Sequence, residues 1–167
     1  MSRSKLSLAS CLLFFVLLAC LGCSKPAVDA PPDQAAKPAH DHPAEGPHGG
    51  HLIEFGDEAY HGELTHDDKS STVTVYLLGP DAKTMAHSTD MEVMLNLVVD
   101  GKTVQAKLAS SPQPEDPEGQ SSRYTLVDEK VLEALENPKT TGRLNVNIGG
   151  KSYSGPLALG EHGHDHK

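Results

Sequence analysis

Hydrophobic and polar residues alternate along most of the chain between residues 47 and 159, the period of two expected of strands with one buried face. The clearest run is TVTVYLL at 72–78, which is rich in β-branched and aromatic residues. In MEVMLNLVV at 91–99, alternate residues starting at Met91 are predicted to share one apolar face, and Asp100–Gly101 predicts a hairpin turn after it. The other predicted strands are 52–55, 59–65, 102–108, 122–127, 143–148 and 151–159.

One segment, DEKVLEALENP at 128–138, departs from this period and predicts a short helix. Asp128 is the expected N-cap, the buried stripe would be Val131, Leu132 and Leu135, and Asn137–Pro138 would end the helix. About eight short strands separated by turns are typical of an antiparallel β-sandwich. We therefore expect a mainly β domain over 47–159, in which the single helix closes one end or crosses between sheets.

The N-terminus predicts export. Arg3 and Lys5 precede a short apolar run, and the run is too brief for a membrane span of ~20 residues. Residues 1–22 are therefore expected to be a lipoprotein signal peptide that ends before Cys23, the predicted lipidated residue. Cys20, which has the better leucine three positions upstream, is the alternative, and an ordinary cleaved signal with incidental cysteines is a third interpretation.

Composition divides the rest of the chain. Residues 23–46 are rich in Pro, Ala and His and predict a disordered tether, and residues 160–167 form a His-rich tail. The three cysteines all lie in the signal region, so the predicted domain has no disulfide and no thiolate ligand. Loss of the signal removes two basic residues and leaves 12 Lys and Arg against 23 Asp and Glu, a net charge of −11. Such an acidic chain is not expected to bind nucleic acid.

Histidines gather in the tether and in the tail. Imidazole and carboxylate groups are good ligands for zinc and copper. Flexible segments of this kind are expected to bind metal weakly, and the alternative is a solvated polar tail. The candidate ligands in these two segments are His40, His42, His162, His164 and His166.

The motif HGGH at 48–51 is a different kind of candidate, because two glycines allow a tight turn from which His48 and His51 could face one ion. The alternative is a turn or bulge whose histidines cap backbone groups. On the next strand, His61 and Glu63 are expected to share one face and could complete the site if the two strands pair. An exposed polar strand face without a ligand explains the same alternation.

The methionines at positions 85, 91 and 94 raise the possibility of a soft Cu(I) site, since thioethers favour that ion. Met91 and Met94 would face opposite sides of a strand, however, and we expect Met91 to pack in the core. His66 and His87 lie in predicted turns and are assigned to solvent. The sequence shows no nucleophile elbow, metalloprotease motif or phosphate loop, so we do not expect an enzyme.

The segment GPHGGHLIEFGDEAYHGELTHDDKSSTVTVYLLGPDAK, about residues 46–83, resembles the N-terminal periplasmic β-domain of heavy-metal efflux adaptor (membrane-fusion) proteins. Stand-alone bacterial lipoproteins look similar. The resemblance implies a periplasmic β-sandwich associated with metal handling, and His48 and His51 occupy the matching motif. The chain lacks the coiled-coil hairpin, lipoyl and barrel domains of the adaptors, so the resemblance implies an accessory module.

These observations lead to one expected function and one alternative. We expect a lipid-anchored periplasmic protein that binds or buffers a divalent transition metal, zinc or copper, and that is accessory to metal efflux. The alternative is a non-catalytic module that contacts another envelope protein, with incidental histidines. Ser24 after Cys23, in place of Asp, indicates sorting to the outer membrane.

Overall fold

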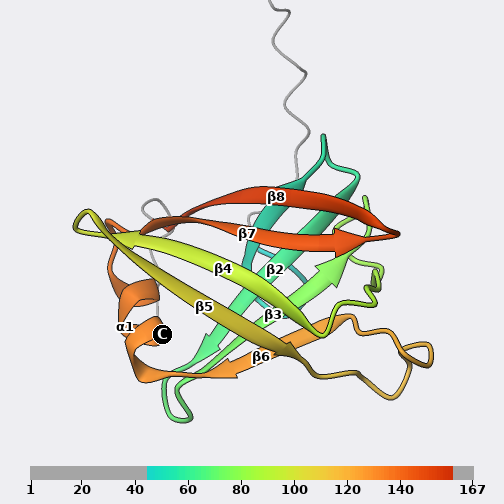
Figure 1. Ribbon diagram of the computed structural model, residues 1–167, viewed down its shortest axis with the longest axis horizontal. Helices are drawn as coiled ribbons and strands as arrows, with labels where there is room; N and C mark the ends of the chain where they lie inside the picture. Colours follow the sequence, from blue (N-terminus) through green and yellow to red (C-terminus); the bar gives the residue numbers. More distant parts are fainter. Residues whose placement is uncertain (1–44, 160–167) are drawn as a thin grey trace, which may run out of the picture. The chain divides into compact units, whose positions relative to one another are not determined.

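The computed structural model describes residues 45–159, apart from the side chain of Ala158. The predicted signal peptide, nearly all of the predicted tether and the His-rich tail lie outside the described residues. Within this part of the chain the structure contains eight antiparallel strands, with one short helix between the sixth and the seventh strand (Figure 1). The elements are β1 (His51–Phe55), β2 (Tyr60–Asp67), β3 (Thr72–Leu78), β4 (Glu92–Val99), β5 (Lys102–Ser110), β6 (Arg123–Val127), α1 (Glu129–Glu136), β7 (Thr141–Ile148) and β8 (Lys151–Ala158).

The strands form a single hydrogen-bonded sheet in the order β1-β2-β3-β6-β5-β4-β7-β8. A sandwich would require two separate sheets, and this division is not confirmed. β6 pairs with β3 on one side and with β5 on the other, and so joins the two halves of the sheet. The join to β5 is narrow, because only two positions pair, Ala109 with Thr125 and Ser110 with Tyr124. In Figure 1 the halves on either side of this join cross at a wide angle.

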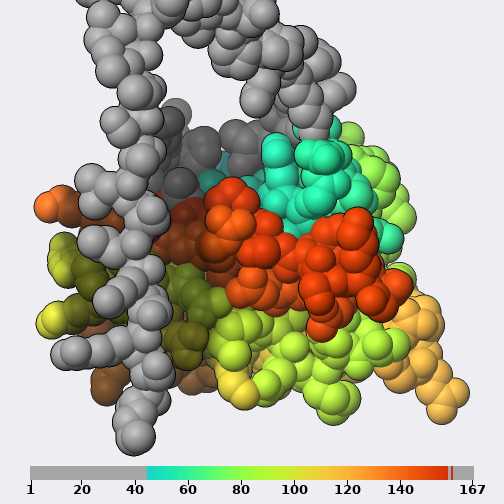
Figure 2. All heavy atoms as spheres, turned by 45° about the horizontal axis from the view of Figure 1, so that its top comes forward, coloured from blue at the N-terminus to red at the C-terminus, as the bar shows by residue number. Residues whose placement is uncertain are grey.

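The two ends of the sheet meet, which makes it nearly closed and barrel-like. β8 lies against β1, and Figure 2 shows β8 on the surface beside the β1–β2 hairpin. Gly155 in β8 permits this approach: a Cβ atom there would lie 2.4 Å from Cγ2 of Ile53 and 2.6 Å from the carbonyl oxygen of Glu54. Any larger residue at this position would push β8 away from β1.

Alternate residues of the strands face inward and form the core, as the period of two predicts. In β4 the inward residues are Val93, Leu95 and Leu97, all buried. The expectation that Met91 belongs to this row is wrong, because Met91 precedes β4 and is 79% exposed. Tyr124 lies fully buried among these side chains, and its hydroxyl donates a hydrogen bond to the carbonyl oxygen of Asp90.

The helix is confirmed where the sequence predicts it. The Asp128 side chain accepts hydrogen bonds from the backbone N–H groups of Lys130 and Val131, and α1 buries Val131, Leu132, Ala134 and Leu135. It packs near one end of the nearly closed sheet (Figure 1). Within residues 45–159 no helix has the length and hydrophobicity needed to cross a membrane.

Candidate functional site

The most unusual buried group of the described domain is the carboxylate of Glu63, in the middle of β2. Glu63 is fully buried. Its neighbours across the sheet are Leu52 on β1 and Tyr76 on β3. Because successive strand residues face opposite sides, Glu63 points away from the core that holds Leu64. An acidic side chain on the outer face of a strand is normally exposed, so something must cover this one.

The cover is the loop of residues 46–50, which precedes β1. The Oε1 atom of Glu63 accepts hydrogen bonds from the backbone N–H groups of His48 (2.6 Å) and Gly50 (2.9 Å). The Oε2 atom lies 2.7 Å from Nδ1 of the His48 ring. The loop is closed on itself by a 3.0 Å hydrogen bond from the Gly46 N–H group to the Gly50 carbonyl. We call residues 46–50 together with Glu63 the Glu63 clasp.

Glycine is required in the clasp because backbone and carboxylate approach closely. A Cβ atom on Gly46 would lie 2.4 Å from Cδ of Glu63. A Cβ atom on Gly50 would lie 2.5 Å from the carbonyl oxygen of Leu64. The glycines of the GPHGGH motif therefore let the loop wrap a buried carboxylate, a role that the spacing of the motif does not predict.

The His48 ring is held in one orientation. It stacks on the ring of Tyr76, with 3.7 Å between the centroids and 5° between the planes. A carboxylate only accepts hydrogen bonds, so with Glu63 ionised the ring hydrogen lies on Nδ1, and in the neutral imidazole Nε2 carries the lone pair. Carboxylates commonly orient metal-binding histidines in this way. The His48 side chain is 32% exposed.

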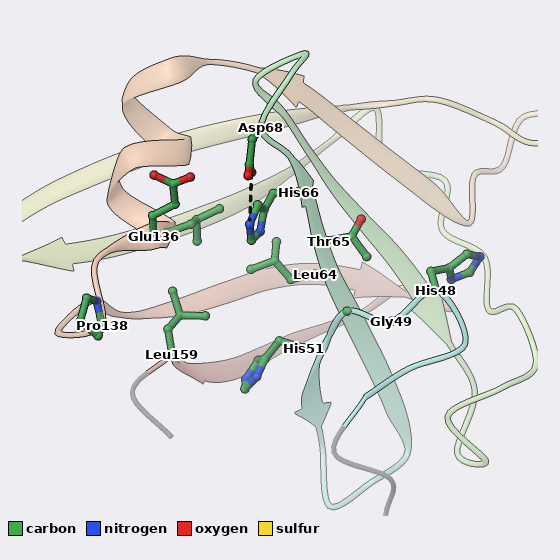
Figure 3. A pocket seen from close by; sticks show the side chains of 12 residues that line it. His48, Gly49, His51, Leu64, Thr65, His66, Asp68, Glu136, Pro138 and Leu159 are labelled. Carbon is green, nitrogen blue, oxygen red and sulfur yellow. Dashed lines mark ion pairs between the residues drawn. The ribbon is translucent and has the colours of Figure 1, made fainter. Parts of the chain in front are cut away.

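His51 and His48 lie on opposite faces of the sheet. It pairs with Leu64 across β1 and β2, and residues opposite each other in an antiparallel pair face the same side. Leu64 belongs to the core, so His51 is on the core-facing side while His48 is held over the outer face. Figure 3 shows the two rings pointing away from each other. The structure thus brings His48 to Glu63 and not to His51.

His61 shares the outer face of β2 with Glu63, as the alternation along the strand predicts, and β1 and β2 pair. The alternative of an exposed polar face is wrong, because both side chains are fully buried. The Nδ1 atom of His61 lies 3.0 Å from the carbonyl oxygen of Gly79, in the segment that follows β3. His61 and Glu63 are therefore engaged with different loops.

A pocket of about 420 Å³ opens between the β1–β2 pair and the C-terminal end of α1. His51 and His66 line it, and so do His48 and Gly49 (Figure 3) and Gly50. The remaining lining residues are Leu64, Thr65, Asp68, Leu135, Glu136, Pro138 and Leu159.

His66 is the pocket residue that sequence reasoning missed. It lies on β2 rather than in a turn, two positions beyond Leu64, so it faces the same side as Leu64 and His51. Its Nε2 atom is 3.6 Å from Oδ1 of Asp68, and its side chain is 32% exposed. The alternation of β2, continued two residues further, would have placed His66 on this face. As arranged, no three or more His, Cys, Asp or Glu side chains of residues 45–159 form a group that could hold a metal ion.

The histidines of the two flanking segments, His40, His42, His162, His164 and His166, lie outside the described residues. The points at which these segments join the domain are described. Glu45 pairs with His51 in an isolated antiparallel bridge. At the other end, Leu159 lines the pocket.

His87, assigned to solvent from the sequence, contacts a buried carboxylate at a different place. Its Nε2 atom is 3.3 Å from Oδ1 of Asp116, whose side chain is 2% exposed. Burial by itself would raise the pKa of Asp116. Hydrogen bonds from Ser122 and from the Gln113 N–H group, with the nearby His87, outweigh burial and hold this pKa below its ordinary value of 3.8.

Comparisons with protein-family models, with curated proteins and with solved structures found no match for this chain. The resemblance of residues 46–83 to the β-domain of efflux adaptors therefore stays a prediction.

Proposed function

We propose that this chain is a lipid-anchored protein of the bacterial cell envelope that binds a divalent transition metal, zinc or copper, at the pocket lined by His51 and His66. The observation that carries the proposal is the placement of two imidazoles on the same side of two paired strands, facing one pocket. The carboxylates of Asp68 and Glu136 line the same pocket and supply oxygen ligands of the kind that zinc accepts.

The register of β1 and β2 supports binding of one ion by both His51 and His66. His51 lies opposite Leu64, so His66 is its diagonal neighbour on the adjacent strand. Diagonal neighbours have Cα atoms about 7–8 Å apart, within reach of long side chains. Imidazole nitrogens bind zinc at about 2.0–2.1 Å. Small rotations of the two partly exposed side chains would therefore let both rings reach one ion.

This ligand pair replaces the pair expected from the HGGH motif. His48 lies over the outer face of the sheet and His51 is on the core-facing side, and the His48 ring is already engaged by Glu63 and Tyr76. In this proposal the Glu63 clasp is a positioning device, because it fixes the chain just before His51. Its loss would disturb the site through the backbone and not by removing a ligand.

The proposed location in the cell envelope rests on the N-terminal sequence. A signal peptide over residues 1–22 followed by Cys23 supports export and lipidation, and Ser24 supports the outer membrane. A surface-anchored acidic protein with histidines on both sides of its domain is suited to buffering metal beside a membrane. The resemblance of residues 46–83 adds that this activity is accessory to metal efflux.

The test is calorimetric titration of the full-length chain, purified in detergent, with Zn(II) and with Cu(II). We expect micromolar or tighter binding that weakens at least about tenfold, which is about 1.4 kcal/mol, in His51→Ala/His66→Ala. His87→Ala, which removes an imidazole outside the pocket, is the matched control and should bind as the unmodified chain does. Equal binding by the double variant and the unmodified chain would overturn the proposal and favour an interaction module with incidental histidines.

A further inference from the structure

A second pocket of the described domain contains a methionine and a histidine that the proposed function does not use. The pocket has a volume of about 530 Å³ and lies at the turn that follows β3. Met85 and His87 line it together with apolar residues that include Pro80 and Ile148. The pocket shares no lining residue with the pocket beside α1, so it is a separate candidate site.

We infer that Met85 and His87 form a site for Cu(I) in this second pocket, with the thioether sulfur and the imidazole as its ligands. Thioether sulfur is a soft ligand that selects Cu(I), and imidazole also suits copper. The inference goes beyond the proposed function, because it concerns other residues and an ion of lower charge.

The backbone directs the Met85 and His87 side chains to the same side of residues 85–88. Met85 and Ser88 each pair with another segment in an isolated antiparallel bridge, which keeps these residues extended. Ala86 and Ser88 are buried, whereas Met85 and His87 between them are half-buried, as expected for an extended chain with one buried face. Cα atoms two positions apart on such a chain are about 6.6 Å apart. The unbranched methionine side chain can therefore bring its sulfur to an ion held by the neighbouring imidazole.

Asp116 orients the His87 ring for binding a metal. Its buried Oδ1 atom is 3.3 Å from Nε2 of His87. Its Oδ2 atom accepts hydrogen bonds from the N–H groups of Gln113 and Ser122, so the carboxylate is fixed in place. Because an ionised carboxylate only accepts hydrogen bonds, the hydrogen of the neutral imidazole lies on Nε2, and Nδ1 carries the lone pair. Carboxylates commonly orient metal-binding histidines in this way.

The pocket offers few ligands for a harder ion such as Zn(II). The carboxylate that lines it, Asp81, already accepts hydrogen bonds on both oxygens, from the N–H groups of Lys83 and Thr84 and from the Thr84 hydroxyl. A zinc site generally has several nitrogen, oxygen or thiolate ligands from the protein, and here His87 supplies the imidazole alone. The apolar lining also favours the ion of lower charge, because moving charge out of water is costly.

The test is titration of the full-length chain with Cu(I), kept reduced by ascorbate without oxygen, in competition with a chromophoric Cu(I) chelator. All chains carry Cys11→Ser/Cys20→Ser/Cys23→Ser, since thiolates would otherwise bind the ion first. We expect Met85→Leu and His87→Gln each to weaken Cu(I) binding at least about tenfold, a loss typical even of residues that only support a ligand. Leucine conserves the volume of methionine, and glutamine keeps an N–H donor, so both variants should unfold in urea near the midpoint of the parent chain.

The matched control is Met91→Leu, which removes a methionine that is 79% exposed and lies outside the pocket lining. This variant should bind Cu(I) as the parent chain does. X-ray absorption spectroscopy gives an independent readout of the ligands. The parent chain should show sulfur and nitrogen bound to Cu(I), and Met85→Leu should lose the sulfur.

Unchanged Cu(I) affinity in Met85→Leu, or a sulfur ligand that persists in this variant, would overturn the inference. Loss of affinity in Met91→Leu instead would overturn it as well, because the exposed methionine would then be the ligand.

His51→Ala/His66→Ala separates the inference from the proposed function. In this variant Cu(I) should keep its sulfur ligand while Zn(II) binding weakens. If the variant abolishes Cu(I) binding and Met85→Leu does not, the inference fails and the proposed function stands. If the variant leaves Zn(II) and Cu(II) binding unchanged while Met85→Leu still weakens Cu(I) binding, the proposed function fails and the inference stands.

Discussion

The Nδ1 atom of His48 lies 2.7 Å from the Oε2 atom of Glu63, a fully buried carboxylate fifteen positions further along the chain. With two backbone N–H groups on Oε1, this contact fastens the segment before β1 onto the outer face of β2. The pairing explains why a charged residue tolerates complete burial: hydrogen-bond donors meet both of its oxygens.

Replacing Glu63 by Gln should destabilise the domain by about 1–3 kcal/mol, because a neutral amide loses the charge-assisted character of the hydrogen bonds that the backbone N–H groups of His48 and Gly50 donate to the carboxylate. The measurement is the free energy of unfolding in urea. Glu54→Gln, on the exposed face of neighbouring β1, is the matched control and should stay within about 0.5 kcal/mol of the unmodified protein. Equal stability of the two variants would show that the clasp does not contribute to folding.

Gly46→Ala should open the clasp, because its Cβ atom would lie 2.4 Å from Cδ of Glu63. The control is Gly49→Ala, whose Cβ atom meets nothing within 4 Å but whose φ of 75° costs about 1–2 kcal/mol in any L-residue. Urea unfolding should therefore rank Gly46→Ala as the less stable variant. Gly46→Ala should lower the free energy of unfolding by less in a Glu63→Ala background, because that background removes the clashing carboxylate. An equal loss in both backgrounds would contradict this explanation.

The free energy of unfolding should decrease at acidic pH, and Asp116 should account for part of this decrease. Its Oδ2 atom accepts hydrogen bonds from the N–H groups of Gln113 (2.8 Å) and Ser122 (2.9 Å). The pKa of Asp116 is lowered in the folded state despite burial, so the ionised group stabilises the fold above its ordinary pKa of 3.8. That contribution is lost as the pH falls from about 4 through the lower folded pKa.

The urea midpoint, followed from pH 6 down to about pH 3, checks this expectation. Asp116→Asn should be less stable near neutral pH and should lose less stability on acidification than the unmodified chain does. Asp100→Asn, in the exposed turn between β4 and β5, should keep the full acid dependence. Parallel curves for Asp116→Asn and the unmodified chain would refute the assignment.

Asp128→Ala should cost about 1 kcal/mol, because two N–H groups of the first turn of α1 lose their acceptor. Asp128→Ser should recover most of this loss, since serine is also a good N-cap. Thermal unfolding of the three proteins measures the effect. If Asp128→Ala and Asp128→Ser destabilise the protein equally, the hydrogen bonds of the N-cap are not the cause of the lost stability.

The elements themselves could be predicted because their signals are local. The TVTVYLL strand occupies Thr72–Leu78 as expected, and Asp128 caps the helix. The arrangement of the strands could not be predicted in the same way. Whether they form one sheet or two depends on the pairing of Ala109 and Ser110 with Thr125 and Tyr124, and no period in the sequence encodes contacts between such distant residues.

The candidate site, like the fold, was predictable from the sequence only in its local features. The sequence by itself determined that His61 and Glu63 share one face of a strand, because side chains alternate with a period of two. Only the tertiary structure decided that this face is buried and that His48 and His51 lie on opposite faces of the sheet, since both depend on where a loop folds back across the sheet. The GPHGGH motif wraps a carboxylate, and the pocket gathers His51 and His66, because strand pairing and not spacing along the chain sets which side chains meet.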